Sequence, residues 1–155
     1  MAAARTTIVK NTNLETIVKV EGSSADTAAT ITLTDLTAST QALVAGGTPT
    51  VNITKVISAG LLTAGVTVTR NNIVVMACAP ENAPIINLTQ DGISDSVQNT
   101  HNIIVTLAGA ASVTYLVLRK IAGWETKVET ATYGAYDDTT RVGARTDVSG
   151  SPDKV

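Results

Sequence analysis

Residues 66–76, which read Val-Thr-Val-Thr-Arg-Asn-Asn-Ile-Val-Val-Met, decide the fold class most clearly. Apolar and polar side chains alternate through residues 66–69, as they do in a strand with one buried face. Asn71 and Asn72 follow where the chain must turn, and Asn tolerates the positive φ angles of tight hairpin turns. A second apolar run, residues 73–76, comes next. The stretch therefore predicts an antiparallel hairpin.

The same alternation recurs along the chain, separated by turn signals about every 8–12 residues, which favours a β-sandwich or jelly-roll-like fold of antiparallel sheets. We expect residues 102–107 and 112–118 to form a second hairpin. The apolar runs 103–105 and 115–118 predict strands that are buried on both sides. Residues 35–40 predict one helical turn. The further predicted strands are residues 14–21, 29–34, 51–54 and 85–88.

The composition is rich in β-branched residues and poor in charge. Thr, Val and Ile supply 26, 18 and 12 of the 155 residues, and 15% of residues are charged, with a formal net charge of −2. A nucleic-acid binder needs a cationic surface, so no nucleic-acid partner is expected. The single cysteine, Cys78, excludes a disulfide scaffold. The longest apolar run, residues 73–79, is far shorter than the roughly 20 residues of a membrane helix, so no membrane partner is expected either.

No motif in the sequence predicts catalysis. His101 has no second histidine to complete a metal site, and general acid–base chemistry depends heavily on His. Cys78 lies among small apolar residues without the neighbouring cations that activate a thiol. Residues 91–95 contain two aspartates but lack the terminal Glu of a calcium loop. We therefore expect a protein that is not an enzyme, with no catalytic residues, no metal and no cofactor.

The chain is predicted to have three parts: an N-terminal extension (residues 1–13), a β-sandwich core (14–123) and an extended C-terminal arm (124–155). The arm contains no Leu and no Ile. A segment of this composition cannot bury enough apolar area to offset its ordering entropy by itself. We therefore expect another chain to hold the arm.

Aromatic residues are concentrated at the start of this arm. Trp124, Tyr133 and Tyr136 are three of the four aromatic residues in the sequence. Aromatic side chains are enriched in interface cores, which predicts that these three contact a partner; the alternative is that they pack back on the chain's own sandwich. Arg141 and Arg145, in the same arm, complete the candidate partner interface.

Part of the chain resembles a known group of proteins. Residues 113–134, Val-Thr-Tyr-Leu-Val-Leu-Arg-Lys-Ile-Ala-Gly-Trp-Glu-Thr-Lys-Val-Glu-Thr-Ala-Thr-Tyr-Gly, and residues 136–144, Tyr-Asp-Asp-Thr-Thr-Arg-Val-Gly-Ala, resemble small virion structural proteins of large tailed phages of marine cyanobacteria. Residues 17–22 and 66–71 are similar too. The resemblance implies a coat-associated, non-enzymatic component present in many copies, on the capsid, the neck or the tail.

These observations lead to one expected function and two alternatives. We expect a capsid decoration protein that forms a homo-oligomer, binds the major capsid protein or other virion proteins through its arm, is made in the host cytoplasm and ends on the capsid surface. The first alternative is a neck or tail protein of the same virion. The second is a host- or carbohydrate-binding module, for which the predicted sandwich offers one aromatic residue, Tyr115.

Overall fold

The computed structural model describes residues 4–22, 28–60, 65–78, 85–90, 98–107 and 112–127, except for the side chains of residues 60 and 78. These residues form eleven strands and one turn of 3-10 helix, and no α-helix occurs among them, which confirms the all-β prediction. The elements are β1 (Arg5–Asn11), β2 (Glu15–Gly22), β3 (Ala28–Ile31), η1 (Leu33–Leu36), β4 (Gln41–Leu43), β5 (Thr50–Gly60), β6 (Val66–Arg70), β7 (Ile73–Cys78), β8 (Ile85–Asn87), β9 (Ile103–Leu107), β10 (Ser112–Ala122) and β11 (Trp124–Thr126).

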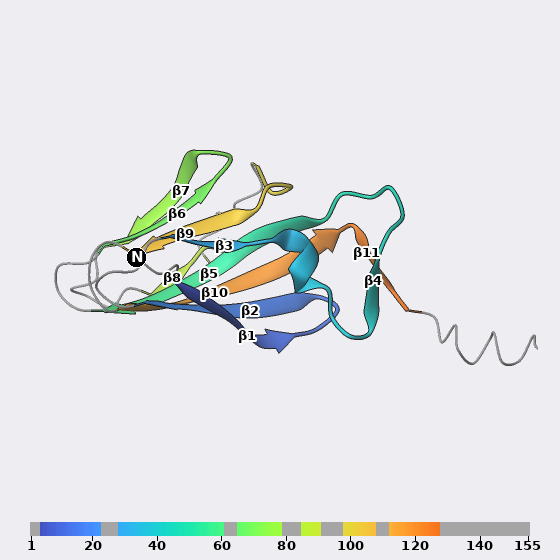
Figure 1. Cartoon of the computed structure of the whole chain (residues 1–155), viewed down its shortest axis with the longest axis horizontal. Helices are drawn as coiled ribbons and strands as arrows, with labels where there is room; N and C mark the ends of the chain where they lie inside the picture. The colour runs from blue at the N-terminus through green and yellow to red at the C-terminus, as the bar shows by residue number, and fades with distance from the viewer. Residues whose placement is uncertain are drawn as a thin grey trace, which may run out of the picture. The chain divides into compact units, whose positions relative to one another are not determined.

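Two antiparallel sheets lie one above the other as a sandwich (Figure 1). The larger sheet has the strand order β1-β2-β10-β5-β8, and the smaller has the order β3-β9-β6-β7. Strands β4 and β11 form a separate two-stranded ribbon. Strand β10 lies at the centre of the larger sheet and pairs with β2 on one side and with β5 on the other.

The core fills the space between the two sheets. Burial alternates along each central strand, as in β6, where Val66 and Val68 have no exposed surface. Leu116 and Leu118 of β10 are equally inaccessible from the opposite layer. Burying an aliphatic side chain of this size contributes about 1.5–3 kcal/mol relative to leaving it exposed. The core is almost entirely aliphatic, because the sequence contains no Phe.

The hairpin predicted from residues 66–76 is present as β6 and β7. Asn71 and Asn72 form its turn with φ angles of 49° and 61°, in the left-handed region that Asn tolerates. The second predicted hairpin is wrong, because β9 pairs with β3 and β6 while β10 pairs with β2 and β5 in the other sheet. Alternation specifies which face of a strand is buried but does not specify its neighbours.

The prediction that β9 and β10 are buried on both faces is also wrong. In β10, Leu116 and Leu118 face the core, while Tyr115 and Val117 face outward and are half-buried. In β9, Ile104 is half-buried on the outer face of the smaller sheet. Within the described residues, no layer covers these outward apolar side chains.

The ends of the predicted core differ from the observed elements. Residues 5–11, assigned to an N-terminal extension, form the edge strand β1, which pairs with β2. Trp124, assigned to the arm, begins β11 and packs against the core. The predicted helical turn is displaced to η1 and is a 3-10 turn. Of the arm, the structure describes only residues 124–127.

Candidate functional site

Of the five predicted interface residues, the structure describes only Trp124. Its indole Nε1 donates a hydrogen bond of 3.1 Å to Thr37 Oγ1, and its ring is half-buried against the core. In the described residues this side chain therefore packs on its own sandwich, which was the alternative left open by the sequence. The remaining predicted interface residues, Tyr133, Tyr136, Arg141 and Arg145, lie outside the described residues.

A buried lysine lies beside the indole. Lys120 of β10 is 6% exposed, and its Nζ is 5.5 Å from the centre of the Trp124 ring. The ammonium donates three hydrogen bonds: 2.7 Å to Asn11 Oδ1, 2.9 Å to the Thr12 carbonyl and 2.6 Å to Gln41 Oε1. Burial lowers the pKa of Lys120 from 10.5 to about 8, because removal from water disfavours the charged form.

The acceptors around Lys120 are themselves held in place. Thr16 Oγ1 donates 2.9 Å to Asn11 Oδ1, and Gln41 Nε2 donates 2.8 Å to the Asn13 carbonyl. The network thus joins the turn between β1 and β2, the start of β4 and the end of β10. Because one ammonium group donates hydrogen bonds to oxygens of several segments, it holds these segments in fixed positions relative to one another. We call this cluster the Lys120 node; Lys120 itself is four residues before Trp124, the first residue of β11.

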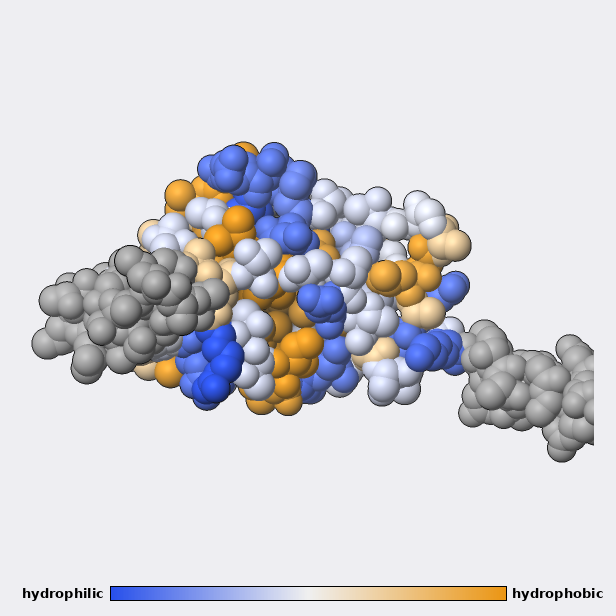
Figure 2. All heavy atoms as spheres, in the orientation of Figure 1, coloured by the Kyte–Doolittle hydropathy of each residue, from blue (hydrophilic) through white to orange (hydrophobic). Residues whose placement is uncertain are grey.

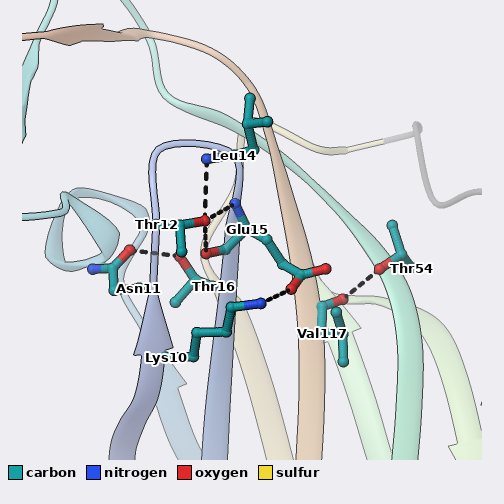
Figure 3. Close-up of polar contacts among 8 residues, drawn as sticks. All are labelled: Lys10, Asn11, Thr12, Leu14, Glu15, Thr16, Thr54 and Val117. Carbon is teal, nitrogen blue, oxygen red and sulfur yellow. Dashed lines mark hydrogen bonds and ion pairs between the residues drawn. The ribbon is translucent and has the colours of Figure 1, made fainter.

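A hollow opens near the Lys120 node, on the outer face of the larger sheet. Its volume is about 440 Å³. Thr12 shapes one wall: its hydroxyl donates to the Glu15 carbonyl and accepts from the Glu15 amide, each at 3.0 Å, which fixes the β1–β2 turn (Figure 3). The lining residues are Thr12, Leu14, Glu15, Thr54, Thr89 and Arg119.

The outer face of the larger sheet carries an excess of positive charge. Its carboxylates already have partners, since Glu15 Oε1 lies 2.8 Å from Lys10 Nζ and Glu21 Oε2 lies 2.7 Å from Arg5 Nη2. The Arg5 contact lowers the pKa of Glu21. The outward charged side chains of the described strands are Arg5, Lys10, Lys19, Lys55 and Arg119 on the positive side and Glu15 and Glu21 on the negative side.

Apolar side chains occupy the centre of the same face. Register places Tyr115 of β10 between Lys19 of β2 and Ile57 of β5, and places Val117 beside Ile17 in the next outward row. All of these side chains are half-buried. Tyr115 is therefore flanked on both sides by half-buried side chains of the neighbouring strands. We refer to this cationic and apolar surface as the β10 face.

The smaller sheet presents a different outer face. In the described residues of β3, β6, β7 and β9, the only charged side chain is Arg70, which points inward and has no exposed surface. Its guanidinium donates to the carbonyls of Val51, Asn99 and His101 over 2.7–3.0 Å. The outward positions include Thr67, which lies opposite Thr106.

The other residues considered in the sequence do not assemble into a reactive group. The His101 ring is exposed, and Nδ1 lies 3.4 Å from Thr100 Oγ1. The Cys78 side chain and residues 91–95 are outside the described set. Within the described ranges, no group of three or more His, Cys, Asp or Glu side chains is placed to hold a metal ion. The same part of the chain contains no helix long and apolar enough to cross a membrane.

Sequence reasoning missed Lys120 and Arg70, the two buried cations among the described residues. A signal for Lys120 was present, because it continues the inward series of alternating positions in β10 after Leu116 and Leu118. No local pattern marked Gln41 or Asn11 as its partners, since both are distant in sequence. Comparisons with protein-family models, with curated proteins and with solved structures found no match to the chain.

Proposed function

We propose that this chain is a non-enzymatic structural subunit of a tailed-phage particle and that it decorates the capsid. The observation that carries the proposal is the surface of the sandwich: in the described residues its sheets have unpaired edge strands and two outer faces of different chemistry. One is the cationic and apolar β10 face, and the other is the face of the smaller sheet, where the described strands present no charge. The resemblance of residues 113–134 and 136–144 to virion proteins supports the same assignment.

The open edges suit lateral association. Edge strand β1 exposes Ile8 and Val9, at 42% and 56%, and edge strand β7 exposes Ile73 and Val74, at 48% and 59%. Hydrophobic side chains reach the surface where Figure 1 draws these strands (Figure 2). Soluble monomers usually protect such edges with charges, prolines or covering loops; β1 carries the charges Arg5 and Lys10, whereas β7 carries no charged residue. Strands with this character are the places where a neighbouring chain adds to a sheet.

The smaller sheet suits packing against another protein. Its outer rows combine Thr with apolar side chains, as at Thr69, which lies between Ile104 and Val74 in register. Such a surface offers hydroxyl groups and methyl groups, and no charge in its described strands has to be removed from water on docking. We propose that one of the two faces lies on the major capsid protein, so that binding stabilises the assembled shell by mass action.

A neck or tail position in the same virion is the second candidate. The open edges favour it equally, because rings and tubes also form by lateral pairing of identical subunits. Copy number and location together separate the positions. A decoration protein is expected on heads in hundreds of copies, a tail-tube protein on tails in hundreds of copies, and a neck protein in a closed ring of about six or twelve copies.

The experiment is a measurement of the chain in purified particles. Heads and tails are separated, and the chain is quantified in each fraction by mass spectrometry with isotope-labelled peptides. The proposal expects it in the head fraction in hundreds of copies. Presence in the tail fraction in any copy number, or about six or twelve copies per particle, would favour the second candidate, and absence of the chain from particles would refute both.

A further inference from the structure

We propose that the β10 face, around Lys55 and Arg119, binds residues 128–140 of a neighbouring copy of this chain. The inference deepens the proposed function, because it rests on an arm that joins neighbouring subunits and it names the receptor for that arm. Three observations support it: the cations available on the face, the apolar floor between them and the charge of the segment that follows the last described residue.

Lys55 and Arg119 are the cations of this face that have no ion pair among the described residues. Arg5 and Lys19 both contact Glu21, and Lys10 contacts Glu15. Glu15 lies directly opposite Arg119 in register, but Lys10 holds its carboxylate. Arg119 is exposed and lines the hollow, so its guanidinium can take a carboxylate from outside in a bidentate geometry.

The two cations lie close enough to act together. Lys55 is opposite Val117 in the β10–β5 register, and Arg119 follows Val117 by two residues on the same face of the sheet. In a regular ladder the Cβ atoms of such diagonal neighbours lie about 7–8 Å apart, and the register shift between Val117 and Leu118 adds one residue of β5 to this separation, which long Lys and Arg side chains span. The two cations can therefore bind carboxylates of one peptide segment.

The apolar floor between the cations calls for a ligand that is not simply anionic. Tyr115, Val117, Ile17 and Ile57 are half-buried on the outer side of a sheet that no described layer covers. Aromatic side chains bury large areas on such floors at small entropic cost. The matching ligand is an extended peptide that carries both carboxylates and aromatic rings.

Residues 128–140 of the chain have this composition. They read Val-Glu-Thr-Ala-Thr-Tyr-Gly-Ala-Tyr-Asp-Asp-Thr-Thr and contain Glu129, Asp137 and Asp138 without any Lys or Arg, a net charge of −3. Tyr133 and Tyr136 supply the aromatic rings. In an extended segment Glu129, Tyr133 and Asp137 share one face, so their carboxylates and ring can meet the β10 face together, while Asp138 adds to the local negative charge. The opposite charges of the β10 face and of this segment thus favour binding of the segment from a second copy.

A charge-swap experiment with the full-length chain tests the inference. One variant is Lys55→Glu with Arg119→Glu, and the other is Asp137→Lys with Asp138→Lys. Sedimentation velocity at increasing concentration measures self-association of the wild type, of each variant, of their equimolar mixture and of the fourfold variant. A matched control, Lys127→Glu with Thr34→Glu and Ser39→Glu, lowers the net charge by the same four units as the Lys55–Arg119 variant, at exposed positions outside the β10 face and outside residues 128–140. Circular dichroism verifies that each variant is folded.

The wild type and the control are expected to associate, and each double variant alone is expected to associate at least about tenfold more weakly. The mixture and the fourfold variant should recover association, because each restores opposite charges across the contact. Added salt should weaken association of the wild type, a result that requires no variant. The inference is refuted if the wild type stays monomeric at every accessible concentration, if salt has no effect, or if the swaps do not restore binding.

These outcomes are separate from those of the particle measurement. If the charge-swapped variants do not recover association but the chain is present on heads, the β10 face is refuted as the receptor and the virion assignment stands. If they do recover association but the chain is absent from particles, the virion assignment is refuted and the contact between copies stands.

Discussion

Replacing Lys120 by Met should lower the free energy of unfolding at neutral pH by about 2 kcal/mol. Met has nearly the length of the lysine stem and keeps the packing beside Trp124, so the change removes mainly the ammonium. The ammonium donates to Asn11 Oδ1, the Thr12 carbonyl and Gln41 Oε1 over 2.6–2.9 Å. The substitution therefore tests the three hydrogen bonds that hold the Lys120 node together.

The magnitude follows from opposing contributions. Hydrogen bonds from a charged donor contribute about 1.5–3 kcal/mol each, but burying the ammonium costs part of that sum. Two acceptors keep another donor in the variant: Asn11 Oδ1 keeps the Thr16 hydroxyl, and Gln41 Oε1 keeps the Ala38 amide at 3.3 Å. The net loss is therefore nearer to one strong hydrogen bond than to three.

Urea unfolding followed by tryptophan fluorescence measures the effect. Trp124 is the only tryptophan, and its ring lies 5.5 Å from Lys120 Nζ, so the probe reports on this part of the structure. Lys127→Met is the matched control, because Lys127 is exposed and the change in side chain is identical. The control should change the unfolding free energy by less than about 0.5 kcal/mol. Equal stabilities of the two variants would refute the role assigned to the Lys120 node.

Three further predictions concern stability. The pKa of Lys120 is about 8 in the folded chain, against 10.5 for an ordinary lysine, so between these pH values the unfolded state binds more protons than the folded state. The free energy of unfolding of the wild type should therefore rise, relative to that of Lys120→Met, as the pH rises from 8 to 10.5. A difference between the two proteins that stays constant over this range would contradict the lowered pKa. Gly123→Ala should lower the free energy of unfolding by about 2 kcal/mol or more, because φ is 91° and the added Cβ would lie 2.5 Å from Pro49 Cα. Gly46→Ala, where φ is 71° and no atom lies within 4 Å of the added Cβ, should lower it by about 1 kcal/mol. Equal shifts of the thermal unfolding midpoint in the two variants would refute the clash at Gly123. Arg70→Lys should destabilise the chain by at least about 2 kcal/mol in urea, because an ammonium cannot reproduce the four hydrogen bonds that the guanidinium donates to main-chain carbonyls, and a wild-type midpoint would contradict that role.

The strands that sequence predicts best are those with one strongly apolar face. The hairpin β6–β7 was predictable because alternation and the Asn71-Asn72 turn agree. Strand β1 was missed because its side chains are almost all exposed at a sheet edge, where pairing with β2 stabilises it without a buried face. The three-residue strands β4 and β11 were missed because segments so short carry no period.

Pairing between strands was less predictable than their existence. β9 and β10 are consecutive strands with a short connection, yet they belong to different sheets. The outward apolar residues Tyr115 and Val117 looked like the second face of a buried strand, and the structure leaves that face without a covering layer in the described residues. The same two residues form part of the apolar floor of the proposed receptor, so the apolar pattern that wrongly predicted burial on both faces marks the β10 face.

The candidate site was only partly accessible from the sequence. Aromatic clustering directed attention to Trp124, and the structure places this residue beside the Lys120 node. The node itself depends on Asn11 and Gln41, whose contacts with Lys120 join positions 109 and 79 residues apart. Local patterns carry no information about such contacts. Charge on the β10 face was likewise invisible until register had placed Lys55 and Arg119 on the same surface.

A reconstruction of the virion that contains this chain tests the virion assignment most directly. The account predicts density that fits the two-sheet sandwich at many symmetry-related positions on the outside of the head, with the β10 face of each copy in contact with an extended segment of its neighbour. Particles whose heads and tails contain no density of this shape would contradict the account.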